Sequence, residues 1–532
     1  MSTRRETSEP PPGPATAATS APGPPTPTGI EGGDAPGPSA RELRFGDQGV
    51  SLRRRAARGT IINGGFLVGL SILSMLKGFI VAAILSTTDY GLWGFLAAAL
   101  GSLYWLKQIG IADKFIQQDE GDEELAFQRA FTLEAIVNGV FLLLILGVIP
   151  LLAFVYGLDE VVAPGLVLAA TVPAATLQTP LWIFVRRMQF LKQRLLQSIS
   201  PIVGFVVTIA MAVAGYGYWS LVIGVLVGAW AAAVAVLIAS PYRLRFRFDR
   251  ATARSYFTFS WPLFIAGASI VAMTQLPVLV AAKAVGLAGV GAIALASLIP
   301  AYARQASDVV TQTMYPGVCA VKDRADLMLE AFTKSNRLGI LWGAPLGVSL
   351  ALFAPDLVDY VLGSKWEFAV GLLQAMGLVT AANQFGFNWT AFYRAIGVTR
   401  PIATASVIQA VAICAIAAPL LAVEGLDGFA IGMGIATAIY LVVRAYYLTK
   451  LFPGFSILRH SVRAHAPTVA GVLVVLGGRA LLGGDRGVEV AIAELLLYAL
   501  TVLAATLAAE GALVREALGY LRKRGRPQPT AA

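Results

Sequence analysis

An arginine and an aspartate, Arg304 and Asp308, stand four residues apart inside an apolar stretch long enough to cross a membrane. On insertion scales, a charged side chain at the centre of a membrane helix costs about 3 kcal/mol. Residues four apart share one face of a helix, so these two side chains can form an ion pair. The pattern predicts either a neutralised pair that fixes two helices or the polar wall of a water-filled cavity.

Other polar side chains interrupt neighbouring apolar stretches. Lys77 has no carboxylate near it in sequence, and Gln305 and Gln312 extend the polar strip that Arg304 begins. Plainer interpretations exist, because a lysine can extend to the membrane surface and amides can join helices by hydrogen bonds. Taken as ligand groups, cations and amides suit an anionic, hydroxyl-rich molecule. The candidate substrate-binding set is Lys77, Gln275, Arg304, Gln305, Asp308, Gln312, Asn383 and Asn388.

Composition indicates a membrane protein with many spans. The 532 residues are 57% hydrophobic and 14% charged, whereas soluble domains carry about 25% charged residues. The net charge of +10 does not indicate nucleic-acid binding, because Lys and Arg lie in short loops between apolar stretches. The two cysteines and two histidines form no metal-binding or disulfide pattern. A GxxxxGK[ST] phosphate loop is also missing. We therefore expect no metal, no cofactor and no catalytic residue, and a transporter rather than an enzyme.

Apolar runs of spanning length predict an all-α protein with about fourteen transmembrane helices. Their expected ranges are 60–85, 90–111, 130–156, 161–185, 197–215, 218–240, 255–281, 287–314, 331–354, 367–392, 401–421, 426–448, 464–482 and 488–511. With the N-terminus inside, nearly all basic residues fall in the inner turns; those in outer turns are Lys283, Lys365, Arg479 and Arg486. This asymmetry predicts that both termini are cytoplasmic.

The expected spans divide the chain into segments. A Pro/Gly-rich tail at 1–55 has too few large apolar residues to fold, so we interpret it as disordered and cytoplasmic. Residues 56–248 and 249–450 would form two lobes of six helices each, related by an axis along the membrane normal. Two further helices at 451–512 and a basic cytoplasmic tail at 513–532 would complete the chain.

Four motifs, in order, resemble one family of exporters. They are "STTDYGLWGFLAAALGSLYWLKQIGIADKFIQ" at 86–117, "FVRRMQFLKQRLLQSISPIVGFVVTIAMAVAGYGYWSLVIGVLVG" at 184–228, "LGSKWEFAVGLLQ" at 362–374 and "YRAIGVTRP" at 393–401. Together they resemble Wzx-type polysaccharide and O-antigen flippases, and most closely the colanic-acid-exporter type. These flippases belong to the multidrug/oligosaccharidyl-lipid/polysaccharide (MOP) superfamily.

The resemblance implies a function and a location. It implies a flippase that moves undecaprenyl-diphosphate-linked oligosaccharide across the bacterial inner membrane by alternating access, for surface polysaccharide synthesis. In the family the first, second, seventh and eighth helices line the cavity, and Lys77 and Arg304 lie on two of these. Expected partners are the lipid-linked oligosaccharide, membrane lipids, a polysaccharide polymerase and glycosyltransferases, but no nucleic acid. The alternatives are a multidrug or cation antiporter of the same superfamily and a membrane polysaccharide polymerase or ligase.

Overall fold

The computed structural model describes the backbone of residues 52–107, 111–117, 121–187, 189–257, 280–398, 400–482 and 487–523. These residues belong to one compact unit, Val50–Ala532. Within them the regular secondary structure is helical and contains no strand. The predicted all-α class is confirmed.

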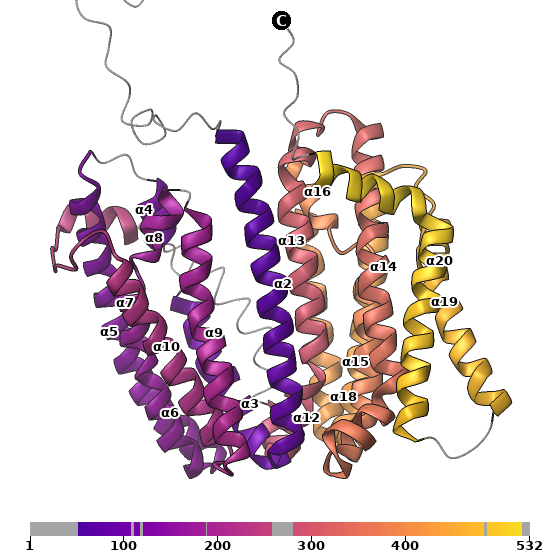
Figure 1. Cartoon of the computed structure of the whole chain (residues 1–532), viewed down its shortest axis with the longest axis horizontal. Helices are drawn as coiled ribbons and strands as arrows, with labels where there is room; N and C mark the ends of the chain where they lie inside the picture. The colour runs from indigo at the N-terminus through magenta and orange to yellow at the C-terminus, as the bar shows by residue number, and fades with distance from the viewer. Residues whose placement is uncertain are drawn as a thin grey trace, which may run out of the picture. The chain divides into compact units, whose positions relative to one another are not determined.

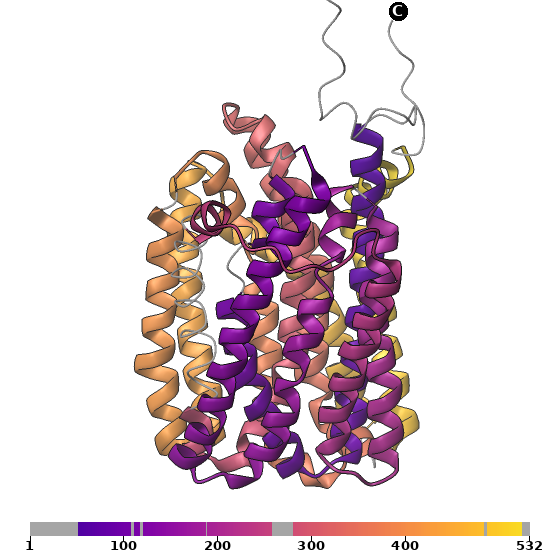
Figure 2. The same ribbon diagram turned by 90° about the vertical axis from the view of Figure 1, so that its left-hand side faces the viewer.

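Long helices lie side by side in this unit (Figures 1 and 2). In its first part the elements are α2 (Leu52–Ile84), α3 (Thr87–Lys107), α4 (Ile111–Gln117), α5 (Glu123–Tyr156), η1 (Asp159–Val161), α6 (Val162–Ala169), α7 (Thr171–Leu177), α8 (Leu181–Arg186), α9 (Phe190–Val213) and α10 (Trp219–Ala239). They continue with α12 (Gly286–Ala296), α13 (Leu298–Ala320), α14 (Ala325–Leu357), η2 (Val358–Leu362), η3 (Ser364–Ala369), α15 (Val370–Asn383), α16 (Trp389–Ala395), α17 (Arg400–Ala412), η4 (Ile413–Ala417), α18 (Ala418–Leu451), α19 (Ile457–Leu482) and α20 (Val488–Lys523).

Many of these helices can cross a bilayer. Among the described residues, ten helical stretches are long and apolar enough to do so. They expose large apolar side chains, such as Leu143 at 71%, Phe154 at 85% and Ile238 at 82%. Apolar side chains at this density belong in lipid rather than in water. The chain is therefore a multi-pass membrane protein.

The expected spans agree with the structure to different degrees. Each of them overlaps described helical residues, the span 255–281 only at its two ends, because 258–279 lies outside the described residues. The expectation of one helix over 161–185 is wrong, because η1, α6, α7 and α8 divide this stretch. The expected spans 401–421 and 426–448 lie in one almost continuous helical stretch from α17 to α18. The chain turns within this stretch at Gly425, where φ is 66°.

The expected single helix at 367–392 is also wrong. It divides into η3, α15 and α16, with the second break at 384–388 and Gly386 at φ 64°. The Arg444 guanidinium donates to the carbonyls of Asn383 and Phe385 at this break. A cation is stabilising at the C-terminal end of a helix, where carbonyls lack partners. The buried Arg444 of α18 thus stabilises the helix break at 384–388.

Two glycines bring α3 and α12 into backbone contact. A Cβ atom on Gly91 would overlap the carbonyl of Leu287, and one on Gly291 would lie 2.8 Å from the carbonyl oxygen of Thr87. Neither carbonyl can move by a side-chain rotation. We call α2–α10 the first group of helices and α12–α18 the second group. The two groups meet here only because both positions are glycine and carry no side chain.

The same end of the bundle holds a clamp on α2, formed by Lys365 and Trp366 in η3. Lys365 Nζ donates to the carbonyls of Ala83 at 2.7 Å and Leu85 at 2.5 Å. Trp366 Nε1 donates to the carbonyl of Ala82 at 2.9 Å. These carbonyls end α2 and have no partner in their own helix. Burial lowers the pKa of Lys365 below the usual lysine range, yet the amine keeps its donors. We call these two residues the α2 clamp.

We predict that Gly91→Ala destabilises the protein. The new Cβ overlaps a backbone atom, so the helices must separate, and overpacking of this kind costs roughly 1–3 kcal/mol. The measurement is thermal unfolding of purified protein in detergent. Gly101→Ala on the same helix is the matched control, because a Cβ there meets nothing within 4 Å. Equal melting temperatures for the two variants would contradict the contact.

We predict that the double variant Lys365→Met/Trp366→Phe loosens the end of α2. The double variant keeps most of the apolar volume but removes the three hydrogen bonds that Lys365 and Trp366 donate. Each carbonyl left buried without a partner costs about 1–3 kcal/mol. Hydrogen exchange of peptides covering residues 80–90 should therefore become faster. Glu367→Gln, at an exposed position of the same turn, should leave the exchange unchanged. Unchanged exchange in the double variant would show that the clamp does not hold α2.

Candidate functional site

Helices α2 and α13 meet along an antiparallel seam (Figure 1). Ser71 Oγ donates to Gln305 Oε1 at 2.9 Å, and one turn further along α2 the Ser74 side chain lies near that of Tyr302 and interacts with it. A Cβ on Gly78 would lie 2.7 Å from Leu298 Cδ1. The residue numbers rise along α2 while those of the facing residues on α13 fall, so the two helices are antiparallel. We call these three contacts the α2–α13 seam.

Three of the predicted site residues lie beside this seam. Lys77 precedes Gly78, and Arg304 precedes Gln305. One residue turns a helix by about 100°, so each cation lies roughly a quarter turn from the seam. In an antiparallel pair of helices, the residue that precedes a contact residue lies on the same side of the contact in both helices. Asp308, three residues after Gln305, falls on that side as well. Helix geometry therefore gathers Lys77, Arg304 and Asp308 along one edge of the seam.

The exposed face of α13 is polar. Arg304, Gln305 and Asp308 are all exposed. The two charged groups act on each other electrostatically, but within the described part of the chain they form no ion pair closer than 4.0 Å. Lipid cannot solvate charged groups on such a face. The face is therefore suited to a hydrated space rather than to hydrocarbon.

Lys77 lies off the apolar stripe of its own helix. On the described part of α2 the large exposed apolar side chains recur every four residues: Val68, Ile72, Leu76, Ile80 and Ile84. Such a stripe is typical of contact with lipid. Lys77, which is half-buried, points about a quarter turn away from it. Its ammonium group is thus turned from the lipid-facing side.

Behind α13 a buried polar network connects α13, α14 and α19 with the break that follows α15. Ser307 Oγ donates to Gln384 Oε1 at 3.1 Å, and Asn336 Nδ2 donates to the Gln384 carbonyl at 3.1 Å. Asn336 Oδ1 lies 2.8 Å from His460 Nε2 on α19. Buried polar groups joined in this way hold a helix in one position. The network fixes the buried side of α13 next to the exposed charges.

The amide residues predicted on the span 367–392 lie in different surroundings. Asn388 is 1% exposed and donates through Nδ2 to Ser335 Oγ at 2.7 Å. Asn383 is half-buried at the end of α15, and its carbonyl accepts from Arg444. Gln275 and the side chain of Gln312 lie outside the described residues. The substrate-binding role of the whole predicted set stays a prediction.

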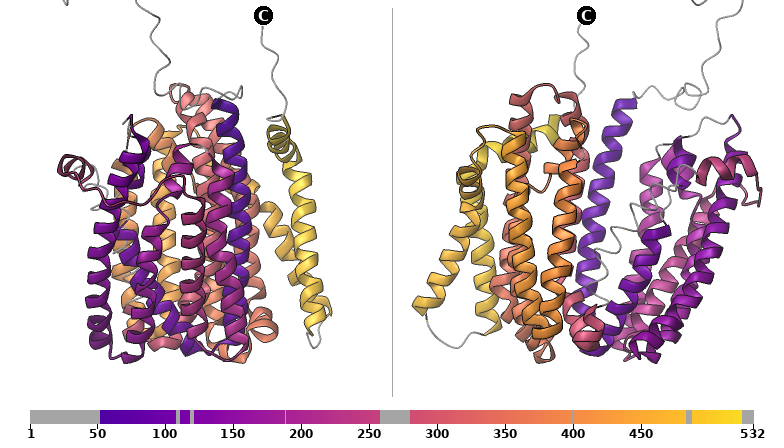
Figure 3. Two further views of the ribbon diagram at one scale, coloured as in Figure 1. Left: turned by 60° about the vertical axis from the view of Figure 1, so that its left-hand side comes forward. Right: turned by 180° about the vertical axis from the view of Figure 1, so that it is seen from behind.

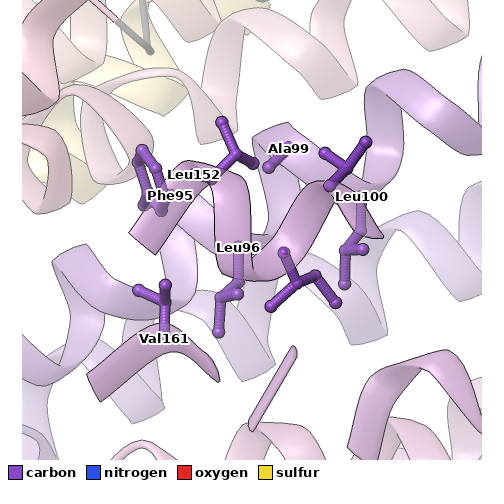
Figure 4. Close-up of a pocket in the computed structure, with 8 residues that line it drawn as sticks. Phe95, Leu96, Ala99, Leu100, Leu152 and Val161 are labelled. Atoms are coloured by element: carbon purple, nitrogen blue, oxygen red, sulfur yellow. The ribbon is translucent and has the colours of Figure 1, made fainter. Parts of the chain in front are cut away.

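A separate small pocket lies between α3, α5 and η1 (Figure 4). Its lining is entirely apolar: Phe95, Leu96, Ala99, Leu100, Val148, Ile149, Leu152 and Val161. No donor or charge is available there to orient a polar ligand. The exposed charges beside the α2–α13 seam therefore remain the better candidate for a polar cargo.

Sequence reasoning missed the residues that position these charges. Ser71, Ser74 and Gly78 share one helix face, and this spacing of small residues was an available signal for close helix packing. The α2 clamp gave no comparable signal, because Lys365 and Trp366 bind carbonyls about 280 positions earlier in the chain. The role of Arg444 also gave no sequence signal, since its partners are the backbone carbonyls of Asn383 and Phe385.

Among curated proteins, this chain is similar to a transport protein of polysaccharide biosynthesis. The succinoglycan biosynthesis transport protein ExoT of Rhizobium meliloti (strain 1021) is 27% identical over 241 residues. The match covers 42% of this chain and 48% of that protein, so the chain matches about half the length of its curated relative.

Solved structures show the same fold. The lipid II flippase MurJ, in an inward closed conformation, superimposes with a TM-score of 0.65 at 14% identity, over 86% of this chain and 100% of that one. An inward-facing MATE multidrug-resistance transporter of the MOP superfamily gives 0.57 at 12% identity, over 75% and 100%. At these identities the likeness shows a transporter fold alone. The family described as polysaccharide biosynthesis protein matches residues 80–371, more than half of the sequence, and the chain belongs to that family.

Proposed function

We propose that this protein is a flippase that carries an undecaprenyl-diphosphate-linked oligosaccharide across a bacterial inner membrane, with both termini in the cytoplasm. The family supports a role in polysaccharide biosynthesis, and the relative ExoT is named as a transport protein. The observation that carries the proposal is the charged, exposed face of α13 beside Lys77. Cations held on helices of a transporter fold suit a phosphorylated sugar head.

The charges have distinct tasks in this proposal. Lys77 and Arg304 bind the diphosphate, because an ammonium and a guanidinium both hydrogen-bond phosphate oxygens and neutralise them. Asp308 keeps the empty site from holding an excess of positive charge. Gln305, whose side chain is fixed by Ser71, offers an amide to sugar hydroxyls. The polyprenyl chain stays in lipid while the head crosses.

The closed end of the bundle supports alternating access. The α2 clamp and the Gly91–Gly291 contact hold the first group of helices against the second where α2 ends. In our proposal this end faces the outer side of the membrane, as the predicted distribution of basic residues among the turns would require. In our proposal these contacts close the outer side while the head binds from the cytoplasm, and they separate when the head is released. A polysaccharide polymerase and glycosyltransferases would act before and after this step.

We predict that loss of the protein traps its substrate. In the native host, depletion of the protein should raise the amount of undecaprenyl-linked repeat units in the cytoplasmic leaflet and reduce surface polysaccharide. The measurement is mass spectrometry of extracted lipid-linked sugars, combined with a leaflet-specific label. A cation antiporter would leave these pools unchanged, and a polymerase would let single repeats reach the outer leaflet. Either result would reject the proposal.

We predict that Arg304→Ala lowers export at least tenfold with unchanged abundance in the membrane, since the lost charge-assisted hydrogen bonds are worth about 1.5–3 kcal/mol. Arg304→Lys keeps the charge and should restore part of the export. Arg324→Ala is the matched control, because Arg324 is exposed in the turn before α14 and pairs with Asp326 at 3.4 Å. Normal export by Arg304→Ala would exclude Arg304 from the site.

A further inference from the structure

An extended basic strip follows α10 at residues 240–249. Its backbone is neither helix nor strand, and it runs along the beginning of α5. Gln128 Nε2 donates to the Arg243 carbonyl at 3.3 Å, and the Arg247 amide donates to Thr132 Oγ1 at 2.7 Å. These two bonds hold the strip against α5 at both ends of its central part.

Side chains alternate along this strip, as they do in any extended chain. The even-numbered aromatic residues turn to α5: Tyr242 lies 6.2 Å from Phe127, and Phe246 lies 5.3 Å from Phe131, between ring centroids. The odd-numbered residues of this part of the strip are Arg243, Arg245 and Arg247, and all three are exposed. Three guanidinium groups therefore project from the same edge.

Nothing in the described part of the chain neutralises these arginines. The ion pairs nearby join Glu123 to Arg186 and Arg187 instead. A helical segment at 250–257 follows, started by Asp249, whose carboxylate accepts from the Thr252 amide at 2.7 Å. It adds the exposed Arg250. Figure 3 (left) shows this segment standing at the side of the neighbouring helices.

The depth of the strip follows from the apolar surface beside it. On α5 the large exposed apolar side chains begin at Ile136 and end at Val155, and on α10 they end at Ile238. At 1.5 Å per residue the α5 stretch spans about 28 Å, the thickness of the hydrocarbon core. Phe131, against which Phe246 packs, lies about 7 Å before this belt. The strip therefore lies at the level of the lipid headgroups.

Two aromatic side chains at this level are largely exposed. Phe246 is 75% exposed despite its contact with Phe131, and Phe248 is 64% exposed. Exposed phenyl rings next to arginines are costly in water but favourable at a membrane interface, where the ring enters the boundary and the cation meets phosphate. An acidic protein segment would match the charge but would not explain the depth or the rings.

We propose that residues 241–257 form a membrane-surface anchor that binds anionic phospholipid headgroups. Arg243, Arg245 and Arg247 contact headgroup phosphates, and Phe246 and Phe248 insert at the boundary of the acyl region. Because the strip is bonded to α5, headgroup binding fixes the height of this part of the protein in the bilayer. The anchor is independent of the transported cargo.

The test is the position of residue 248 in membranes of defined composition. The full-length chain with Cys319→Ser, Cys414→Ser and Phe248→Cys is labelled with a bimane fluorophore and placed in nanodiscs. One set contains phosphatidylcholine alone, and the other contains phosphatidylcholine with phosphatidylglycerol. Both carry a lipid with a quencher just below the headgroup. We expect clear quenching with phosphatidylglycerol and less than half of it without.

Charge variants separate the arginines from general effects. R243Q/R245Q/R247Q should reduce the quenching to the phosphatidylcholine level, whereas K322Q/R324Q/K334Q, which removes the same charge from an exposed turn and the start of α14, should leave it unchanged. Equal quenching in every membrane and variant would overturn the role of the arginines. A label unquenched in both lipid mixtures would place the strip in water, free for a protein partner, and would overturn the anchor.

Discussion

Hydrocarbon does not solvate charge, and this constraint decides how the helix α13 must be placed. Arg304 and Asp308 are exposed on a helix otherwise embedded among membrane helices, and among the described residues no ion pair within 4.0 Å joins them. A face of this kind is stable only beside water or a polar ligand. The buried network through Ser307, Gln384 and Asn336 holds the adjoining buried side of the same helix. The exposed charges are thus kept in one orientation at the seam with α2.

Backbone groups obey the same constraint at the ends of helices. The last carbonyls of α2 are satisfied by Lys365 and Trp366, and those at the break after α15 by Arg444. Both solutions use donors from distant parts of the sequence. In the first, the donors also tie together two groups of helices (Figure 3, right). Separating these two groups of helices would leave the last carbonyls of α2 without their donors, so the contact stabilises the joined arrangement.

Hydrophobic length alone predicted most of this fold. The spans follow from the need for about 20 apolar residues, and those over the described residues coincide with helices. Breaks within spans were missed, since a helix such as 367–392 can be interrupted when another side chain, here Arg444, satisfies the freed carbonyls. For the site, the exposed charges of α13 were found from their cost in lipid, whereas Ser71 and Ser74 were not. Asn388, which belongs to the predicted substrate-binding set, is buried and donates to Ser335 Oγ, and its role in binding stays a prediction.

The central claim is that the charged face of α13 borders water inside the membrane. Single cysteines at Ala301 and Asp308 on this face, and at Ile72 and Leu76 on the apolar stripe of α2, test it directly in a Cys319→Ser/Cys414→Ser background. The account predicts that a charged, water-soluble maleimide added to membranes open on both sides modifies the two α13 positions much faster than the two α2 positions. Equally slow modification at all four positions would contradict it.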